Sequence, residues 1–249
     1  ALIDKLAAEF SDELGNLGVR VSNLERNADK VKWTGEARYT YTSARHEDEK
    51  NDNTDKLQFR LYPTAEVNNN WHVNARLTAN TDLSSDKGDD GNVKLTYVYA
   101  DGQYGNFNVK LGKMPFFSTE TAGMLFDDQF SGAQVTFGKN LKATLEAGRW
   151  DLNSANTQSN LHDAAGKTDD DAANYQGIAL NGTAGKLYGG AAYRHFNSNV
   201  FTQTKGFEKN TDEANIWSVG AGYTFDKSWN LYGAYAKNEK AESDATAHN

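Results

Sequence analysis

The chain contains no cysteine and only two prolines among its 249 residues. Without cysteine it forms neither disulfides nor thiolate metal sites. It also lacks the roughly 18 consecutive apolar residues that a membrane-spanning helix requires, and its mean hydropathy is −0.76. Lys and Arg number 26 against 34 Asp and Glu, a net charge of −8. A nucleic-acid binder normally presents a basic surface, so the composition excludes that class along with helical membrane proteins.

The composition is rich in glycine and aromatic residues: Gly 22, Tyr 12, Phe 12 and Trp 5. Combined with many polar residues, this mixture is typical of a transmembrane β-barrel, which needs an apolar outer face, a wet interior and aromatic girdles. A soluble globular protein remains an alternative at this point.

The first 31 residues carry apolar side chains at alternating spacings of three and four, which predicts an α-helix that packs in a coiled coil. Gly15 and Gly18 each weaken that helix by up to about 1 kcal/mol, so we expect association with sister copies to supply the missing burial. An amphipathic helix packed on its own domain is the alternative. The predicted oligomerisation positions are Ile3, Phe10, Leu14, Leu17, Val21, Leu24 and Val31.

From Lys32 onward the apolar residues recur at every second position, which predicts about eleven β-strands with one apolar face each. We therefore expect a coiled-coil stalk over residues 1–31 and an all-β domain, a transmembrane antiparallel β-barrel, over residues 32–249. Examples of the predicted lipid-facing sides are Trp33-Gly35-Ala37-Tyr39-Tyr41, Val93-Leu95-Tyr97-Tyr99 and Leu141-Ala143-Leu145-Ala147.

Short and long connections alternate between the predicted strands. Short ones such as "GKN" and "DKS" carry turn residues, whereas long ones such as "SARHEDEKNDNTD" are polar. A membrane barrel has this arrangement, with short periplasmic turns and long outer loops. The odd strand count and the polar end "KNEKAESDATAHN" predict that several C-terminal strands are missing from a full barrel of about 16 strands.

Three stretches resemble one known family. The heptad helix "LAAEFSDELGNLGVRVSNLE", the junction "VKWTGEARYTY" and the segment "VKLGKMPFFSTETAGMLFDDQFSGAQVTFG" resemble the SLH-domain outer-membrane porins of the OmpM type from diderm bacteria. The resemblance implies a homotrimeric barrel in outer-membrane lipid and a stalk that crosses the periplasm. In that family an SLH domain binds peptidoglycan or its attached polymer. This sequence has no SLH domain, so that partner is expected only through a missing segment.

The positions between the apolar ones are expected to line the lumen, because a charge facing lipid costs about 2 to 4 kcal/mol near the bilayer midplane. By resemblance to porins, the aromatic and acidic loop 116–128 folds into the lumen as a constriction and presents Glu120, Asp127 and Asp128 to basic wall residues. A packed surface loop or a trimer contact is the alternative. The basic wall residues predicted to face the lumen are Arg38, Arg60, Arg76, Lys94, Lys110, Lys142 and Arg194.

The sequence predicts a passive channel for small hydrophilic solutes rather than an enzyme. The five histidines show no metal-ligand spacing and no motif indicates catalysis, so neither metal nor cofactor is expected. One alternative is a structural tether between the outer membrane and the peptidoglycan layer, with a plugged barrel. The other is a soluble β-rich surface protein or adhesin.

Overall fold

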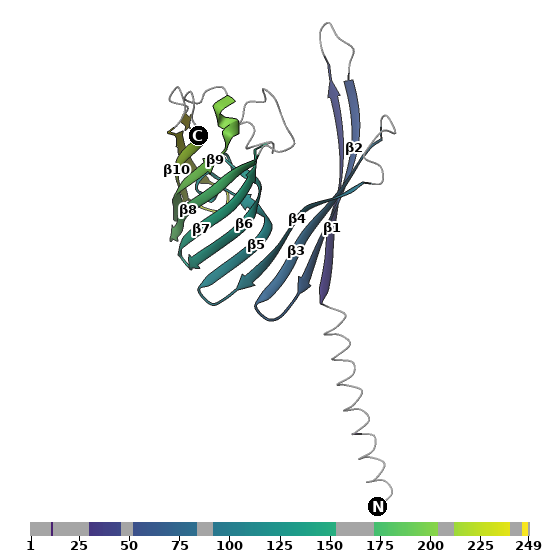
Figure 1. Cartoon of the computed structure of the whole chain (residues 1–249), viewed down its shortest axis with the longest axis horizontal. Helices are drawn as coiled ribbons and strands as arrows, with labels where there is room; N and C mark the ends of the chain where they lie inside the picture. Colours follow the sequence, from purple (N-terminus) through teal and green to yellow (C-terminus); the bar gives the residue numbers. More distant parts are fainter. Residues whose placement is uncertain are drawn as a thin grey trace, which may run out of the picture. The chain divides into compact units, whose positions relative to one another are not determined.

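The computed structural model describes residues 11, 30–45, 52–83, 92–152, 172–203, 212–239 and 246–248 (Figure 1). The chain divides into two compact units, Ala1–Thr96 and Tyr97–Asn249. The described residues consist of antiparallel strands, two short 3₁₀ helices and the turns and loops that connect them, with one further helical position at residue 11. None of their helices has both the length and the apolar character needed to cross a membrane.

Unit 1 is a meander of long strands. It contains β1 (Val31–Ala44), β2 (Asp52–Glu66), β3 (Trp71–Asp82) and the start of β4 (Val93–Gln103). β1 pairs with β2 and β2 with β3, each antiparallel. The β2–β3 turn is closed by Asn68, whose side-chain oxygen accepts hydrogen bonds from the backbone N–H groups of Asn70 and Trp71 at 2.9 and 3.0 Å.

The two faces of unit 1 have the predicted alternation. Trp33 lies opposite Pro63 and Tyr39 opposite Leu57, and both aromatic side chains are 60% exposed. The other face is polar, as shown by the Arg60 guanidinium, which donates to Glu36 at 2.8 Å. Large exposed apolar side chains on one face and ion pairs on the other suit a sheet that separates an apolar medium from water.

Unit 2 continues as a meander in which every strand pairs antiparallel with the next. Two 3₁₀ helices interrupt it, after β5 and after β9. Its elements after β4 are β5 (Phe107–Phe117), η1 (Thr119–Thr121), β6 (Asp127–Gly138), β7 (Leu141–Asp151), β8 (Ala172–Ala184), β9 (Leu187–Asn197), η2 (Asn199–Gln203), β10 (Glu213–Thr224), β11 (Asn230–Asn238) and β12 (Thr246–His248).

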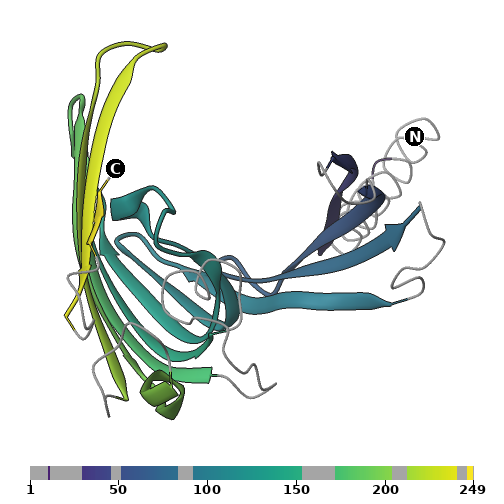
Figure 2. The ribbon, with the colours of Figure 1, turned by 90° about the horizontal axis from the view of Figure 1, so that it is seen from above.

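We call the face of unit 2 that carries Trp150, Tyr175 and Arg194 its inner face, and the opposite one its outer face. Trp150, Tyr175 and Arg194 are buried, whereas outer side chains such as Leu145 and Val219 are each 49% exposed. The segment between β5 and β6 lies on the inner side of the curved strands (Figure 2). The core of unit 2 therefore forms between the wall and a loop folded onto it.

The alternation of short and long connections is confirmed by the strand bounds. Connections 104–106, 139–140 and 185–186 are short, whereas 152–171 and 198–212 are long. Successive hairpins therefore place all short turns at one end of the strands, as the sequence pattern predicted. The eleven predicted strands correspond to β1–β11.

Three details differ from the sequence prediction. Val31 opens β1 opposite Ala65 instead of ending a helix, because its backbone already joins the ladder. A three-residue return strand, β12, follows the polar segment after β11, where none was expected. Tyr99 lies opposite Gly112 with Lys110 near its ring, on the inner face and not on the apolar face. The remaining stalk positions, Ile3, Phe10, Leu14, Leu17, Val21 and Leu24, lie outside the described residues.

Candidate functional site: the inner loop and its wall

The loop between β5 and β6 is closed at its neck and occupies residues 118–126, shorter than the predicted 116–128. The Ser118 backbone N–H donates to the Phe126 carbonyl at 2.9 Å, and the Phe126 N–H donates to the Ser118 hydroxyl at 3.1 Å. Ala122 and Gly123 then turn the chain with φ of 50° and 80°. A Cβ on Gly123 would lie 2.3 Å from the Phe117 ring, so glycine is needed at this tight return.

The loop is fixed to three consecutive wall strands through Glu120. Arg194 on β9 donates from Nη1 to Oε1 at 2.5 Å and from Nη2 to Oε2 at 3.2 Å. The Ser218 hydroxyl on β10 donates to Oε1 at 2.7 Å, and the Tyr232 hydroxyl on β11 donates to the Glu120 carbonyl at 2.5 Å. We call Glu120, Arg194, Ser218 and Tyr232 the loop latch.

The ion pair of the latch is removed from solvent, since Glu120 and Arg194 are each 1% exposed. Burial raises the pKa of the Glu120 carboxyl, but the hydrogen bonds and charge of Arg194, together with the Ser218 hydroxyl, outweigh it and place that pKa below its ordinary value. Glu120 is therefore ionised at neutral pH. A bidentate pair with both charges hydrogen-bonded is the geometry in which a buried ion pair is tolerated.

A glycine on the wall makes room for the loop. Gly220 on β10 lies where a Cβ would be 1.8 Å from the Glu120 carbonyl oxygen. Any side chain there would displace the loop backbone from β10. Gly220 is thus a requirement for the loop's close approach rather than for the strand itself.

Aromatic residues pack beside the latch and complete its enclosure. The Arg194 guanidinium lies 5.1 Å from the Phe116 ring centroid and 5.8 Å from that of Phe126, within the range of cation–π attraction. Trp150 and Tyr175 make edge-on contacts with Phe116 at 4.9 and 6.3 Å. We call this group the aromatic cluster: Phe116, Phe126, Phe130, Trp150, Tyr175 and Phe196.

A row of polar residues crosses the inner face just below the aromatic cluster. Glu146 accepts hydrogen bonds from Gln134 at 3.1 Å and from the Tyr175 hydroxyl. Gly177 separates Glu146 from Arg194 in the register, and a Cβ there would lie 2.6 Å from the Tyr175 hydroxyl and 2.7 Å from the Glu146 carboxylate, so the glycine leaves room for those two groups. By strand register the row runs Asp101, Lys110, Gln134, Glu146, Gly177, Arg194.

The predicted wall residues divide between the two units. In unit 1 the strand register places Arg38, Arg60 and Arg76 on the polar face, and Lys94 shares the parity of Thr96, whose hydroxyl meets that of Thr78 at 2.8 Å. In unit 2 the inner face carries Lys110, Lys142 and Arg194. Their predicted role in a pore stays a prediction.

The acidic residues of the predicted constriction lie in different places. Glu120 alone lies in the loop and contacts a wall arginine. Asp127 and Asp128 begin β6, where Asp127 pairs with Phe117 on the outer face and Asp128 with Phe116 on the inner face. The strand ladder continues further than the loop's polarity indicated, and alternation then separates the two aspartates.

Ser218, Gly220 and Tyr232 were not singled out from the sequence. Each occupies an inner position of an ordinary alternating strand, and Ser218 and Tyr232 lie 98 and 112 residues from Glu120. The only signal in the sequence was their place in the alternation, between the apolar residues Trp217, Val219 and Leu231, which indicates the inner face.

The fold resembles that of solved bacterial porins. A mutant of the Rh. blastica porin is 14% identical, with a TM-score of 0.52, and the match covers 86% of this chain and 76% of that one. OprB of Pseudomonas putida is 12% identical, with a TM-score of 0.50 and coverages of 88% and 69%. OmpF of Salmonella typhi is 14% identical with a TM-score of 0.43, covering 88% and 82%. No protein-family model and no curated protein match the chain.

Proposed function

We propose that this protein is a porin of the bacterial outer membrane through which small hydrophilic solutes diffuse passively. The observation that carries the proposal is the latched inner loop: a loop fixed on the polar side of a sheet whose other side exposes large apolar side chains. The porin fold of the structures it resembles supports the same assignment. The outer side chains then meet lipid and the inner ones meet water.

In this proposal the loop narrows the channel and the latch sets how far it does so. Passive transport needs no cofactor or catalytic group, only a passage of suitable width and charge. The basic residues Lys110 and Lys142 of unit 2 belong to the wall of that passage, and Arg38, Arg60 and Arg76 on the polar face of unit 1 are predicted from the sequence to have the same role. Neutralising them is expected to lower the preference for anions.

Assembly and tethering are further parts of the proposal that rest on the sequence resemblance. The predicted stalk would join three copies and extend into the periplasm, and an SLH domain elsewhere in the full protein would attach to the peptidoglycan layer. A tether with a plugged barrel remains the second candidate, because the aromatic cluster already fills part of the inner face.

Conductance of the detergent-extracted protein in a planar lipid bilayer tests the proposal. Stepwise openings in groups of three are expected from a trimer of open channels. A protein shown to be inserted, for example by protection of its strands from protease, that passes no current would overturn the channel and favour the tether.

A further inference from the structure

A hollow of about 340 Å³ lies on the inner face of unit 2 between the loop and the short turns. Thr119 of the loop borders it on one side, and the β6–β7 turn borders it on another. Tyr232, which donates to the Glu120 carbonyl, also lines it, so the loop latch forms one of its edges. Its volume falls within the range of small-molecule sites, about 300 to 1,000 Å³.

Both charged side chains that line the hollow are cationic. Lys139 lies in the β6–β7 turn and Lys142 is the second residue of β7, and both are exposed. No acidic side chain is among the described residues that line it, and the nearby Glu120 carboxylate is already bound by Arg194 and Ser218. The hollow therefore carries two positive charges that no lining residue neutralises.

Two stacked tyrosine rings form an aromatic wall in the same hollow. Tyr188 on β9 and Tyr232 on β11 lie parallel, with centroids 6.0 Å apart and an interplanar angle of 4°. Gly222 separates them in the register, and a Cβ there would lie 2.3 Å from the Tyr188 ring. Ring faces are electron-rich and attract the C–H groups of a sugar ring.

Neutral hydrogen-bonding groups complete the lining. Thr119 and Thr183 supply hydroxyl groups, which both donate and accept and therefore suit the hydroxyls of a sugar, and Asn181 lies beside them. Cations, an aromatic wall and neutral polar groups together match a ligand with one anionic end and a hydroxylated body.

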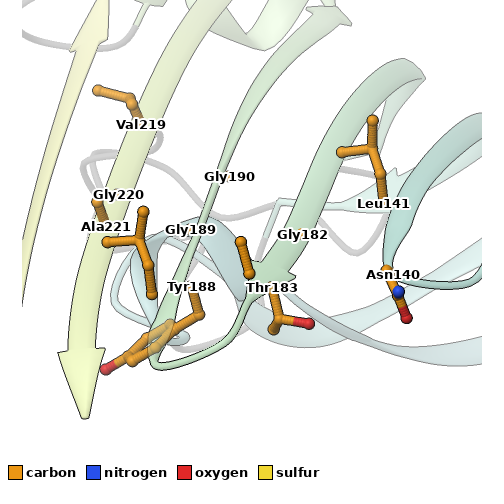
Figure 3. A pocket seen from close by; sticks show the side chains of 12 residues that line it. Asn140, Leu141, Gly182, Thr183, Tyr188, Gly189, Gly190, Val219, Gly220 and Ala221 are labelled. Carbon is orange, nitrogen blue, oxygen red and sulfur yellow. The ribbon is translucent and has the colours of Figure 1, made fainter. Parts of the chain in front are cut away.

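The outer face of the same strands shows the opposite chemistry. A second hollow of about 470 Å³ lies there, bordered by Leu141, Leu187, Val219 and Ala221 (Figure 3). The two hollows share Asn140, Gly182, Thr183, Tyr188 and Gly189, so the wall between them is thin. No charged residue is among the described residues lining this outer hollow, which fits a face turned to lipid. Only the inner hollow therefore suits an anion.

We propose that the inner hollow is a binding site for an anionic, sugar-sized solute of the sugar phosphate class. The inference rests on the proposed function, since it assigns a solute to the passage beside the loop. Lys139 and Lys142 bind the phosphate as point charges, and the Tyr188–Tyr232 wall supports the sugar ring. The site concentrates such solutes next to the narrowest part of the passage.

The test uses glucose 6-phosphate as the probe, with glucose as its uncharged counterpart. In a planar bilayer, glucose 6-phosphate is expected to block the potassium chloride current at concentrations roughly 10-fold or more below those of glucose. Lys142→Gln is expected to weaken the block by glucose 6-phosphate roughly 10-fold. Tyr188→Leu is expected to weaken it while leaving any block by inorganic phosphate unchanged.

Matched controls lie on the outer face. Lys113→Gln and Tyr223→Leu remove a lysine and a tyrosine that are exposed on that face, and neither is expected to change the block. Equal block by glucose and glucose 6-phosphate, or an unchanged block in Lys142→Gln, would overturn the site.

Calorimetric titration of the detergent-solubilised protein measures the same binding without a current. A protein that passes no current but binds glucose 6-phosphate in a manner dependent on Lys142 refutes the channel and supports the site. A conducting protein that binds neither sugar refutes the site and leaves the channel intact.

Discussion

At the scale of single residues, the Glu120–Arg194 pair holds the loop in place. Two opposite charges in contact cancel at distances larger than their own separation, so this pair contributes little to a field across a passage. Lys139 and Lys142 are exposed, and no acidic side chain is among the described residues that line their hollow. Selectivity and loop position are thus assigned to different residues of unit 2.

Substituting one member of the pair leaves the other charged and buried. Arg194→Met is expected to lower the free energy of unfolding by about 3 to 5 kcal/mol, because the Glu120 carboxylate would lose its bidentate partner while remaining out of water. Urea unfolding of the protein folded in lipid vesicles, followed by tryptophan fluorescence, measures this. The double variant Glu120→Gln, Arg194→Met should lose less than the sum of the two singles; additive losses would show that the pair is not coupled.

The depressed pKa of Glu120 predicts how the latch responds to acid. Because that pKa lies lower in the folded than in the unfolded chain, the stabilisation is present above the ordinary carboxyl value of 4.5 and is lost as the pH falls through the lower folded value. Single-channel noise is therefore expected to stay constant from neutral pH down to about 4.5 and to rise below it. Glu120→Gln should lack the transition; a transition of equal size in that variant would assign it to other carboxyls.

At the scale of elements, η1 contacts β9, β10 and β11 together, so the loop depends on how closely β10 permits its approach. Gly220 has no side chain at the point of contact and Tyr232 closes the far side. The inner face therefore has no side chain where the loop backbone crosses β10. The position of the loop therefore depends on a residue of a different element, β10.

Two glycine substitutions distinguish the loss of the contact between the loop and β10 from the general effect of replacing glycine on the backbone. Gly220→Ala is expected to destabilise the protein by about 1 to 3 kcal/mol, since the new methyl group would overlap the Glu120 carbonyl. It should also alter the conductance, because η1 must move away from the wall. The measurements are urea unfolding and single-channel recording on the same preparation.

Gly105→Ala serves as the control, because nothing lies within 4 Å of the Cβ it would add. It is expected to be neutral or to stabilise the protein by about 0.4 to 1 kcal/mol through the unfolded chain. Equal losses in both variants would mean that the cost arises from the backbone and not from the loop contact.

At the scale of the whole molecule, the two-residue periodicity of the sequence predicted the strands and their apolar faces. The lengths of the segments between them predicted the alternation of turns and loops. The periodicity did not place Tyr99, because the alternation that begins at Val93 extends the apolar face to Tyr99, whereas the ladder of unit 2 puts Tyr99 opposite Gly112 on the inner face. It identified Glu120 and Arg194 as a charged loop residue and a charged wall residue, but not Ser218 or Tyr232. Contacts across about 100 residues depend on sheet curvature, which one sequence does not encode locally.

The outer face decides between a membrane barrel and a soluble β-rich protein, and neighbouring residues of β7 provide the test. Leu145 is 49% exposed on the outer face, whereas Thr144 lies inside, where its hydroxyl meets that of Thr136 at 3.0 Å. Leu145→Arg is expected to destabilise the vesicle-folded protein by about 2 to 4 kcal/mol, since the charge would face lipid, and Thr144→Arg by much less. Folding into vesicles, read from the heat-dependent shift in gel mobility, measures both. In a soluble protein Thr144→Arg would be the more destabilising of the two. The arginine at position 145 would then face water, whereas the arginine at position 144 would lie in the packed interior.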